Sequence, residues 1–162
     1  MAIIKPNNNT LSSITALPAS ITTGKILQVV QGTHASEDNF GNTSFQASET
    51  DVDITPSATS SKVLVTVSFT LYMATMNDEY VVTLYRDSTN LATNAASGFG
   101  TIKLDSAAKY GSNVSFQFLD SPNSTSQLHY EMYIKRDSGS GNAILNFNTN
   151  ATSTITAIEI GA

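Results

Sequence analysis

The chain contains no cysteine and no tryptophan, and only 13% of its 162 residues are charged. The absence of cysteine excludes disulfides, thiolate metal sites and cysteine nucleophiles. No stretch approaches the roughly 20 apolar residues that a membrane-spanning helix requires. The first residues also lack the continuous apolar run, about 7–15 residues long, of a secretory signal. We therefore expect neither a transmembrane helix nor a secretory signal in this sequence.

Basic residues are few as well. Eight Lys and Arg residues stand against 13 Asp and Glu residues, which gives a formal net charge of −5 and an isoelectric point near 4.7. Proteins that bind nucleic acids or anionic membranes do so through clusters of Lys and Arg that neutralise phosphate charge. The composition therefore predicts a protein that binds neither nucleic acid nor a membrane. Its polar surface is mostly uncharged, because Ser, Thr and Asn together account for 56 residues.

Apolar residues recur at every second position through most of the chain after residue 24. In residues 62–72, "KVLVTVSFTLY", apolar side chains occupy every second position from Val63 to Leu71, the pattern of a strand with one buried face. The same alternation, in segments rich in β-branched and aromatic residues, predicts further strands. These segments are residues 25–31, 51–54, 79–85, 113–119, 127–135, 143–147 and 153–160.

The segments between these strands have the composition of turns. "ITPSATSS", "YRDSTN", "LDSPNSTS" and "RDSGSGN" combine Asp, Asn, Ser, Pro and Gly. No window places apolar residues at helical spacing for more than about two turns. The sequence therefore predicts an all-β fold for residues 25–162, an antiparallel β sandwich of the jelly-roll type.

Residues 1–24 differ in kind from the rest of the chain. They hold two of the four prolines and three consecutive asparagines, and their apolar residues form only short groups separated by polar or turn-forming residues. A segment of this composition cannot bury enough apolar surface to fold by itself. We therefore predict an extended N-terminal arm that attaches to a partner. The candidate attachment residues are Ile3, Ile4, Leu11, Ile14, Leu17 and Ile21.

Residues that carry acid–base or metal chemistry are sparse. His34 and His129 are far apart in the sequence and have no partners at ligand spacing, so we expect structural or surface roles for both. Glu131 and Glu159 each alternate with apolar neighbours and could pair as the two carboxylates of a glycoside hydrolase, although no pattern brings them together. We expect no catalytic residues, no metal and no cofactor, and predict that the protein is not an enzyme.

Tyrosines offer a different kind of candidate surface. Three of the six fall on the less apolar side of their predicted strands, whereas Tyr130 alternates with apolar residues and is expected in the core. Amphipathic rings of this kind are enriched at protein interfaces. Val63 with Leu64, and Val81 with Val82, make two strands apolar on both sides, which suggests burial against a symmetric partner. The candidate subunit-interface residues are Tyr72, Tyr85, His129 and Tyr133.

Three segments carry a resemblance to a recurrent domain of tailed-bacteriophage structural proteins and tail-fibre-like proteins. They are "ITPSATSSKVLV" (54–65), "LYRDSTNL" (84–91) and "FLDSPNSTS" (118–126), and the resemblance extends over about residues 24–160. "LSSITALP" (11–18) also resembles the leaders that precede this domain. Such domains resemble the trimeric jelly rolls of the tumour-necrosis-factor and complement-head type. The resemblance implies a non-catalytic homotrimer of the virion, assembled in the bacterial host cytoplasm.

The resemblance leaves two placements open. The favoured one is a capsid decoration or cement protein that binds the major capsid protein and stabilises the shell. An extended arm of 24 residues reaches roughly 70–80 Å, and three arms on one trimer raise the effective concentration of each. The alternative is a tail-fibre or head-fibre knob that contacts tail proteins and binds a host receptor or glycan. A fibre usually has a shaft, and a leader of 24 residues is too short to form one. A third function on the same fold is a glycan hydrolase, but this sequence shows no recognisable pair of catalytic carboxylates.

Overall fold

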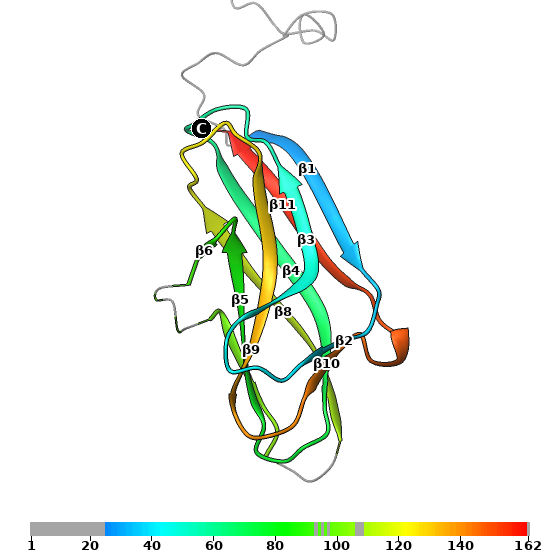
Figure 1. The fold of residues 1–162 in the computed structure, drawn as a ribbon. Coiled ribbons are helices and arrows are strands. Elements are labelled where there is room, and N and C mark those ends of the chain that lie inside the picture. Colours follow the sequence, from blue (N-terminus) through cyan, green and yellow to red (C-terminus); the bar gives the residue numbers. More distant parts are fainter. Residues whose placement is uncertain (1–24, 93, 95, 97, 106–108, 162) are drawn as a thin grey trace, which may run out of the picture.

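The chain folds as a sandwich of two antiparallel sheets (Figure 1). The structure, a computed structural model, describes residues 25–92, 94, 96, 98–105 and 109–161. The predicted arm and its six candidate attachment residues lie outside this part of the chain. The strands are β1 (Lys25–His34), β2 (Asp38–Phe40), β3 (Gln46–Ile54), β4 (Lys62–Met73), β5 (Glu79–Arg86), β6 (Thr89–Asn90), β7 (Gly100–Lys103), β8 (Tyr110–Asp120), β9 (Leu128–Ser138), β10 (Ala143–Leu145) and β11 (Ser153–Gly161), with a 3₁₀ turn, η1 (Phe147–Thr149).

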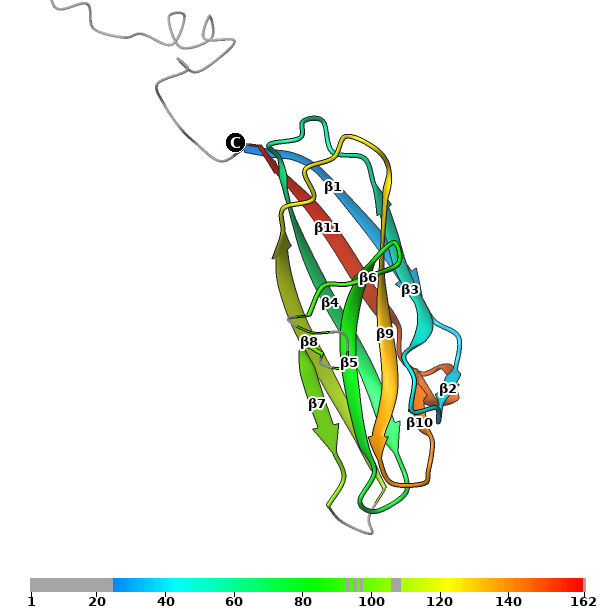
Figure 2. The same ribbon diagram turned by 60° about the vertical axis from the view of Figure 1, so that its left-hand side comes forward.

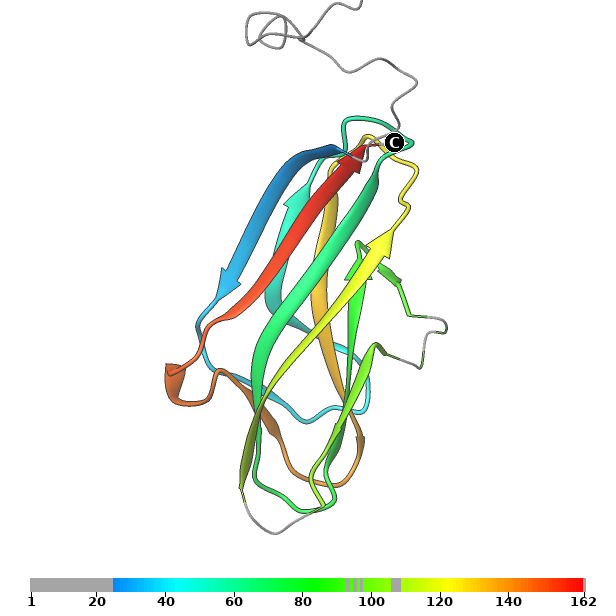
Figure 3. The same ribbon diagram turned by 180° about the vertical axis from the view of Figure 1, so that it is seen from behind.

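The two sheets have the strand order of a jelly roll, which confirms the predicted fold class. In sheet A, the long strands follow the order β1, β11, β4, β8 (Figure 3). The short strand β10 pairs with β4 beyond Ser153, the first residue of β11, and β2 pairs with β10. In sheet B, β9 lies between β3 and β5, and the short strands β6 and β7 both pair with β5 (Figure 2). Lys25 and Gly161 pair with each other, so both ends of the described chain lie at the same end of the sandwich.

The predicted alternation on β4 is confirmed. Its side chains at every second position from Val63 to Leu71 point between the sheets and are at most 1% exposed. They pack against inward-facing residues of β5 and β9, among them Tyr130, whose predicted core position is also confirmed. The core therefore fills the space between sheets A and B along the whole length of β4.

The core position of Val65 allows a first test of this packing. We expect Val65→Ala to lower the free energy of unfolding by about 2 kcal/mol, because it leaves a cavity between the sheets. Urea denaturation followed by circular dichroism measures the loss. Thr101→Ala, on the exposed side of β7, is the control and should change stability by less than about 0.5 kcal/mol. Equal losses from the two variants would contradict the assigned core.

The predicted strand over residues 143–147 is too long at its C-terminal end. β10 stops at Leu145 because Asn146 adopts a left-handed conformation with φ of 51° and the chain turns into η1. Asn146 is fully buried, and its side-chain amide donates to the carbonyl oxygens of His34 (2.9 Å) and Ser36 (3.2 Å). This residue therefore ties the turn after β1 to the turn before β11.

The outer side of β5 is covered by the same chain, which corrects one sequence-based inference. Val81 points away from the core yet is only 8% exposed. A Cβ atom placed on Gly98 would lie 2.5 Å from Cγ1 of Val81, so the backbone at Gly98 covers that side chain. The N–H of Phe99 also donates to the carbonyl of Val82 (2.8 Å). Burial on both sides of β5 therefore has a source within the chain and does not indicate a partner.

Candidate functional surfaces

The two glutamates considered as a catalytic pair lie on different sheets. Glu159, on β11 of sheet A, points inward and is fully buried. Glu131, on β9 of sheet B, points outward beside His129. They cannot act together on one glycosidic bond.

The described residues hold no group of His, Asp and Glu side chains placed to bind a metal ion. The described part of the chain also has no helix long and apolar enough to cross a membrane.

Glu159 is the centre of a buried hydrogen-bond network. Its Oε1 accepts hydrogen bonds from the backbone N–H of Ser57, the Ser57 hydroxyl and the Ser61 hydroxyl, each 2.7 Å long. Its Oε2 accepts a 2.6 Å bond from the side-chain amide of Gln28. Burial alone would raise the pKa of this carboxyl group, but the bonds from Ser57, Gln28 and Ser61 outweigh it and lower the pKa to about 2. The network joins β1, β11 and the loop between β3 and β4.

A second network joins the two sheets at the same end of the sandwich. Asp120, the last residue of β8, is 6% exposed. Its Oδ2 lies 2.6 Å from Nη1 of Arg86 on β5 and accepts a 2.7 Å hydrogen bond from the hydroxyl of Tyr130 on β9. Burial, together with the neighbouring Asp120 carboxylate, raises the pKa of Tyr130 above its usual value. Ser57 and Ser61 come from residues 54–65, Arg86 from residues 84–91 and Asp120 from residues 118–126.

Two of the candidate interface tyrosines lie together on the outer face of sheet B. The rings of Tyr85 and Tyr133 stack with centroids 4.1 Å apart, and Phe45 meets Tyr85 edge-on at 6.1 Å. The Nζ of Lys135 lies 5.3 Å from the centre of the Phe45 ring. A surface depression of about 440 Å³ adjoins this aromatic cluster, with Thr43, Ser44, Phe45, Tyr85, Ala96 and Lys135 around it.

His129 lies on the same face in a group of carboxylates. Its Nδ1 is 2.8 Å from Oδ1 of Asp53 and 3.9 Å from Oδ2 of Asp51, and its Nε2 is 3.6 Å from Oε2 of Glu131. Partial burial lowers the pKa of His129, but the hydrogen bond to Asp53 and the three negative charges outweigh it, so the net pKa is raised. The outer face of sheet B therefore concentrates charge in a chain that has little.

The fourth candidate interface residue, Tyr72, lies on the other sheet. It points outward from β4 of sheet A and stacks on Phe147 with ring centroids 4.1 Å apart. Tyr72 therefore shares no surface with Tyr85, His129 and Tyr133. The four residues therefore belong to two opposite faces of the sandwich.

The outer face of sheet A is made of uncharged rows that run across its four long strands. The strand register aligns one apolar row and two rows of hydroxyl and amide side chains. In the apolar row, Val29 and Leu119 are 58% and 47% exposed, and Ile26 beyond it is 68% exposed. The apolar row is Val29, Ile158, Leu64 and Leu119, followed by Gln31, Thr156, Thr66 and Gln117, and then by Thr33, Thr154, Ser68 and Ser115.

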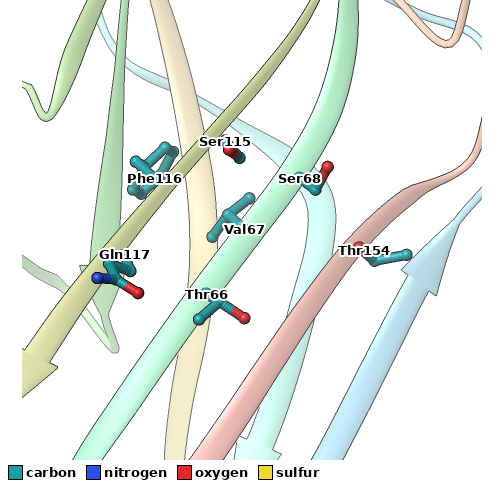
Figure 4. A pocket seen from close by; sticks show the side chains of 7 residues that line it. All are labelled: Thr66, Val67, Ser68, Ser115, Phe116, Gln117 and Thr154. Atoms are coloured by element: carbon teal, nitrogen blue, oxygen red, sulfur yellow. The ribbon is translucent and has the colours of Figure 1, made fainter.

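A depression of about 350 Å³ lies in the middle of this face (Figure 4). Hydroxyl and amide groups of β4, β8 and β11 surround it, and the alternation of each strand places Val67 and Phe116 on the core side. The alternation of β4 in the sequence indicates that Thr66 and Ser68 face outward. No pattern in the sequence shows that β8 and β11 are the neighbours of β4. The residues around the depression are Thr66, Val67, Ser68, Ser115, Phe116, Gln117 and Thr154.

Comparisons with known proteins give a likeness of fold alone. No protein-family model and no curated protein matches the chain. A chain in the solved structure of infectious bursal disease virus, Gx strain, matches with a TM-score of 0.44 and 11% sequence identity. The match covers 82% of this chain and 39% of that chain, so this chain spans less than half the length of its structural neighbour.

Proposed function

We propose that the protein is a structural component of a virion, a capsid decoration or cement protein that binds the capsid shell as a homotrimer. The observation that carries the proposal is the uncharged outer face of sheet A on a jelly-roll sandwich. Exposed apolar side chains such as Val29 and Leu119 are unfavourable in water, and a patch of them indicates a surface that a partner covers. The phage resemblance of three segments supports the virion as the place where that partner is found.

The two buried networks support a role for the arm in attachment. Glu159 and Asp120 lie at the end of the sandwich where β1 begins at Lys25, immediately after the arm. The hydrogen bonds at that end hold the start of β1, to which the arm is joined, in a fixed position on the sandwich. An arm tied to a rigid trimer binds a lattice with higher avidity than a free peptide, because the first contact raises the effective concentration of the other two arms.

The proposal is tested by two measurements on purified particles. One is the number of copies per particle, and the other is the position of the protein on the particle by electron microscopy. A cement protein is expected in proportion to the capsid lattice, in contact with the major capsid protein, and its removal should make the shell less resistant to heat. A protein that is present in few copies at the tail, and that binds host cells when purified, would contradict the cement function.

The arm gives a separate prediction. We expect a variant that lacks residues 1–21 to fold and trimerise but no longer to bind capsids, because the sandwich core is complete from Lys25 onward. Size-exclusion chromatography with light scattering gives the trimer, and co-sedimentation with capsids gives the binding. As a matched pair in the full chain, Ile14→Ser with Leu17→Ser should weaken capsid binding, whereas Asn7→Ser with Asn9→Ser should not. Capsid binding by the truncated variant would contradict the role of the arm.

A fibre knob is the second candidate function, and the aromatic cluster of sheet B favours it. Sugar rings pack their apolar sides on aromatic side chains such as Tyr85 and Phe45, and their hydroxyls bond to groups such as the Ser44 hydroxyl and Lys135. A depression of about 440 Å³ is within the size range of small-ligand sites. The copy number and location on the particle distinguish this candidate from the cement function.

A further inference from the structure

The outer edge of β8 is long and regular. β8 pairs with β4 residue by residue, from Tyr110 to Asp120, without a shift of register. In the described part of the chain no strand pairs with its other side (Figure 3). Its 11 residues contain no proline and no lysine, and its one charged residue, Asp120, is the last. An edge of this kind, without residues that hinder pairing, is a template for a further strand.

The other outer strands are irregular or covered. In β1 the pairing with β11 shifts between Ile26 and Gln28, and the backbone of β3 lies close to Gly32, where a Cβ atom would be 1.8 Å from the carbonyl oxygen of Asp51. In β3 the pairing with β9 shifts between Ala47 and Asp51. β5 is paired with β6 and β7 on the side away from β9. β8 therefore has the edge that is best suited to accept a strand.

The core is also incompletely covered along this edge. The inward side chains of β4 are at most 1% exposed from Val63 to Leu71, whereas Phe116 and Phe118 on the inward side of β8 are only half-buried. Phe99, next to β7 of sheet B, is half-buried as well, and its ring centroid lies 5.5 Å from that of Phe116 and 5.1 Å from that of Phe118. A strand added beside β8 would gain contact with apolar side chains as well as backbone hydrogen bonds.

We propose that the arm of the same chain adds a strand to the outer edge of β8 in the free protein. The segment that pairs is residues 7–17, "NNNTLSSITAL", which lies between Pro6 and Pro18 and contains no proline, the residue that cannot donate a hydrogen bond in a sheet. It matches the 11 residues of β8 in number. The inference goes beyond the capsid attachment of the proposed function, because it concerns the protein before it meets a capsid.

The arm begins within reach of this edge. Lys25 starts β1 at the same end of sheet A where Asp120 ends β8. A strand beside β8 would lie four inter-strand spacings from β1, roughly 19 Å at about 4.8 Å each. Residues 18–24 span up to roughly 23 Å when extended, so Leu17 can reach the Asp120 end of β8. Residues 7–17 would then lie along β8 and run parallel to it.

Charge and proximity favour the arm over a second copy as the occupant. Residues 7–24 carry no charged side chain, and neither does β8 before Asp120, so their pairing brings no like charges together. Two copies that paired through β8 would bring together two chains that each carry a formal charge of −5. The arm is also joined to the same sandwich, which gives it an effective concentration on the order of millimolar at the edge.

Cross-linking tests the position of the arm. The chain contains no cysteine, so two introduced cysteines are the only thiols present. Ser12→Cys is combined with Ser115→Cys on β8, and in the control protein with Thr33→Cys on β1. Ser115 and Thr33 lie at opposite ends of one row across sheet A, so an arm that moves freely can reach both. A short bismaleimide joins thiols that stay close, and mass spectrometry of peptides identifies the products.

We expect cross-links within one chain to be at least about tenfold more abundant for the Ser12 and Ser115 pair than for the Ser12 and Thr33 pair. Equal yields from the two pairs would indicate a free arm and overturn the proposal. Cross-links that join two chains would assign the edge to the arm of another copy and so overturn the path within one chain. No capsid is present in this experiment, so the proposed capsid binding can fail or succeed independently.

Amide hydrogen exchange gives a second measurement without cysteines. Every second amide of β8 faces the free side, and an added strand would slow its exchange. We expect these amides between Asn113 and Leu119 to exchange at least about tenfold faster in a variant that lacks residues 1–21 than in the full chain. The alternate amides, which face β4, are the internal control and should not change. Equal exchange of the outward amides in the two proteins would overturn the proposal.

Discussion

Replacing Glu159 with alanine is expected to lower the free energy of unfolding by about 4 kcal/mol, the largest single loss that we predict. The carboxylate is fully buried and accepts four hydrogen bonds, three from Ser57 and Ser61 and one from Gln28. Alanine leaves these donors, of which the Ser61 hydroxyl is buried and Gln28 is half-buried, without their acceptor, and it also leaves a cavity at the fully buried position of the carboxylate. Urea denaturation at neutral pH, followed by circular dichroism, measures the loss.

Glu159→Gln is the matched control because it keeps the volume and one acceptor oxygen. Its amide oxygen can still accept the bonds from Ser57 and Ser61, but its NH₂ group meets the NH₂ group of Gln28, so we expect a loss of about 1–2 kcal/mol. A loss from Glu159→Ala no larger than that from Glu159→Gln would show that the network does not stabilise the fold.

The low pKa of Glu159 fixes the sign of its pH dependence. Its pKa is about 2 in the folded chain, against 4.5 for a free glutamate. The folded state therefore binds a proton at this site less readily than the unfolded chain does, and stability from this group is fully present above about pH 4.5. It is lost progressively as the pH falls from about 4.5 towards 2. We expect the stability difference between the wild type and Glu159→Gln to narrow over this range, as measured by urea denaturation at several pH values.

The position of Glu159 could be predicted from the sequence, but its partners could not. The residue follows Ile155 and Ala157 at every second position, and this alternation places it on the inward face of β11. Gln28 is 131 residues away in the chain and Ser61 is 98 residues away. Periodicity describes one strand at a time, so it cannot show which distant loop will supply the donors to a buried carboxylate.

The same limit explains the mixed set of candidate interface residues. Alternation placed Tyr72, Tyr85 and Tyr133 on the outward sides of their strands, and the structure agrees in each case. A jelly roll distributes its consecutive strands between two sheets, so outward means opposite directions for β4 and β9. Which sheet a strand joins depends on pairings between distant residues. The sequence pattern of a single strand does not contain that information.

The short strands β2, β6 and β7 were not predicted, for a different reason. β6 has two residues and β2 has three, which is too short for alternation to be seen. Each of the two forms only because a neighbouring strand supplies hydrogen bonds: β6 pairs with β5 across a two-residue turn, and β2 pairs with β10. The other long strands were predicted to within three residues at each end because each has its own buried face, but β3 begins at Gln46, five residues before the predicted strand 51–54. A shift of register between Ala47 and Asp51 in its pairing with β9 accounts for the difference.

Replacing Asp120 with alanine is expected to lower the free energy of unfolding by about 3 kcal/mol. The change leaves the guanidinium group of Arg86 and the fully buried hydroxyl of Tyr130 without their shared acceptor. Arg86 is partly exposed and can turn toward water, which is why the expected loss lies at the lower end of the range for broken buried ion pairs. Urea denaturation measures it. The same network links β8 of sheet A to β5 and β9 of sheet B, so the loss should also appear as faster amide exchange in β8.

A double-mutant cycle separates the hydrogen bond from the ion pair. Tyr130→Phe removes only the hydroxyl that donates to Asp120, and in this background Asp120→Ala should cost about 1 kcal/mol less than in the wild type. Strict additivity of the two changes would show that the bond between Tyr130 and Asp120 contributes nothing. Asp120→Asn retains an acceptor for the Tyr130 hydroxyl and removes the charge that faces Arg86, so it should lie between the wild type and Asp120→Ala.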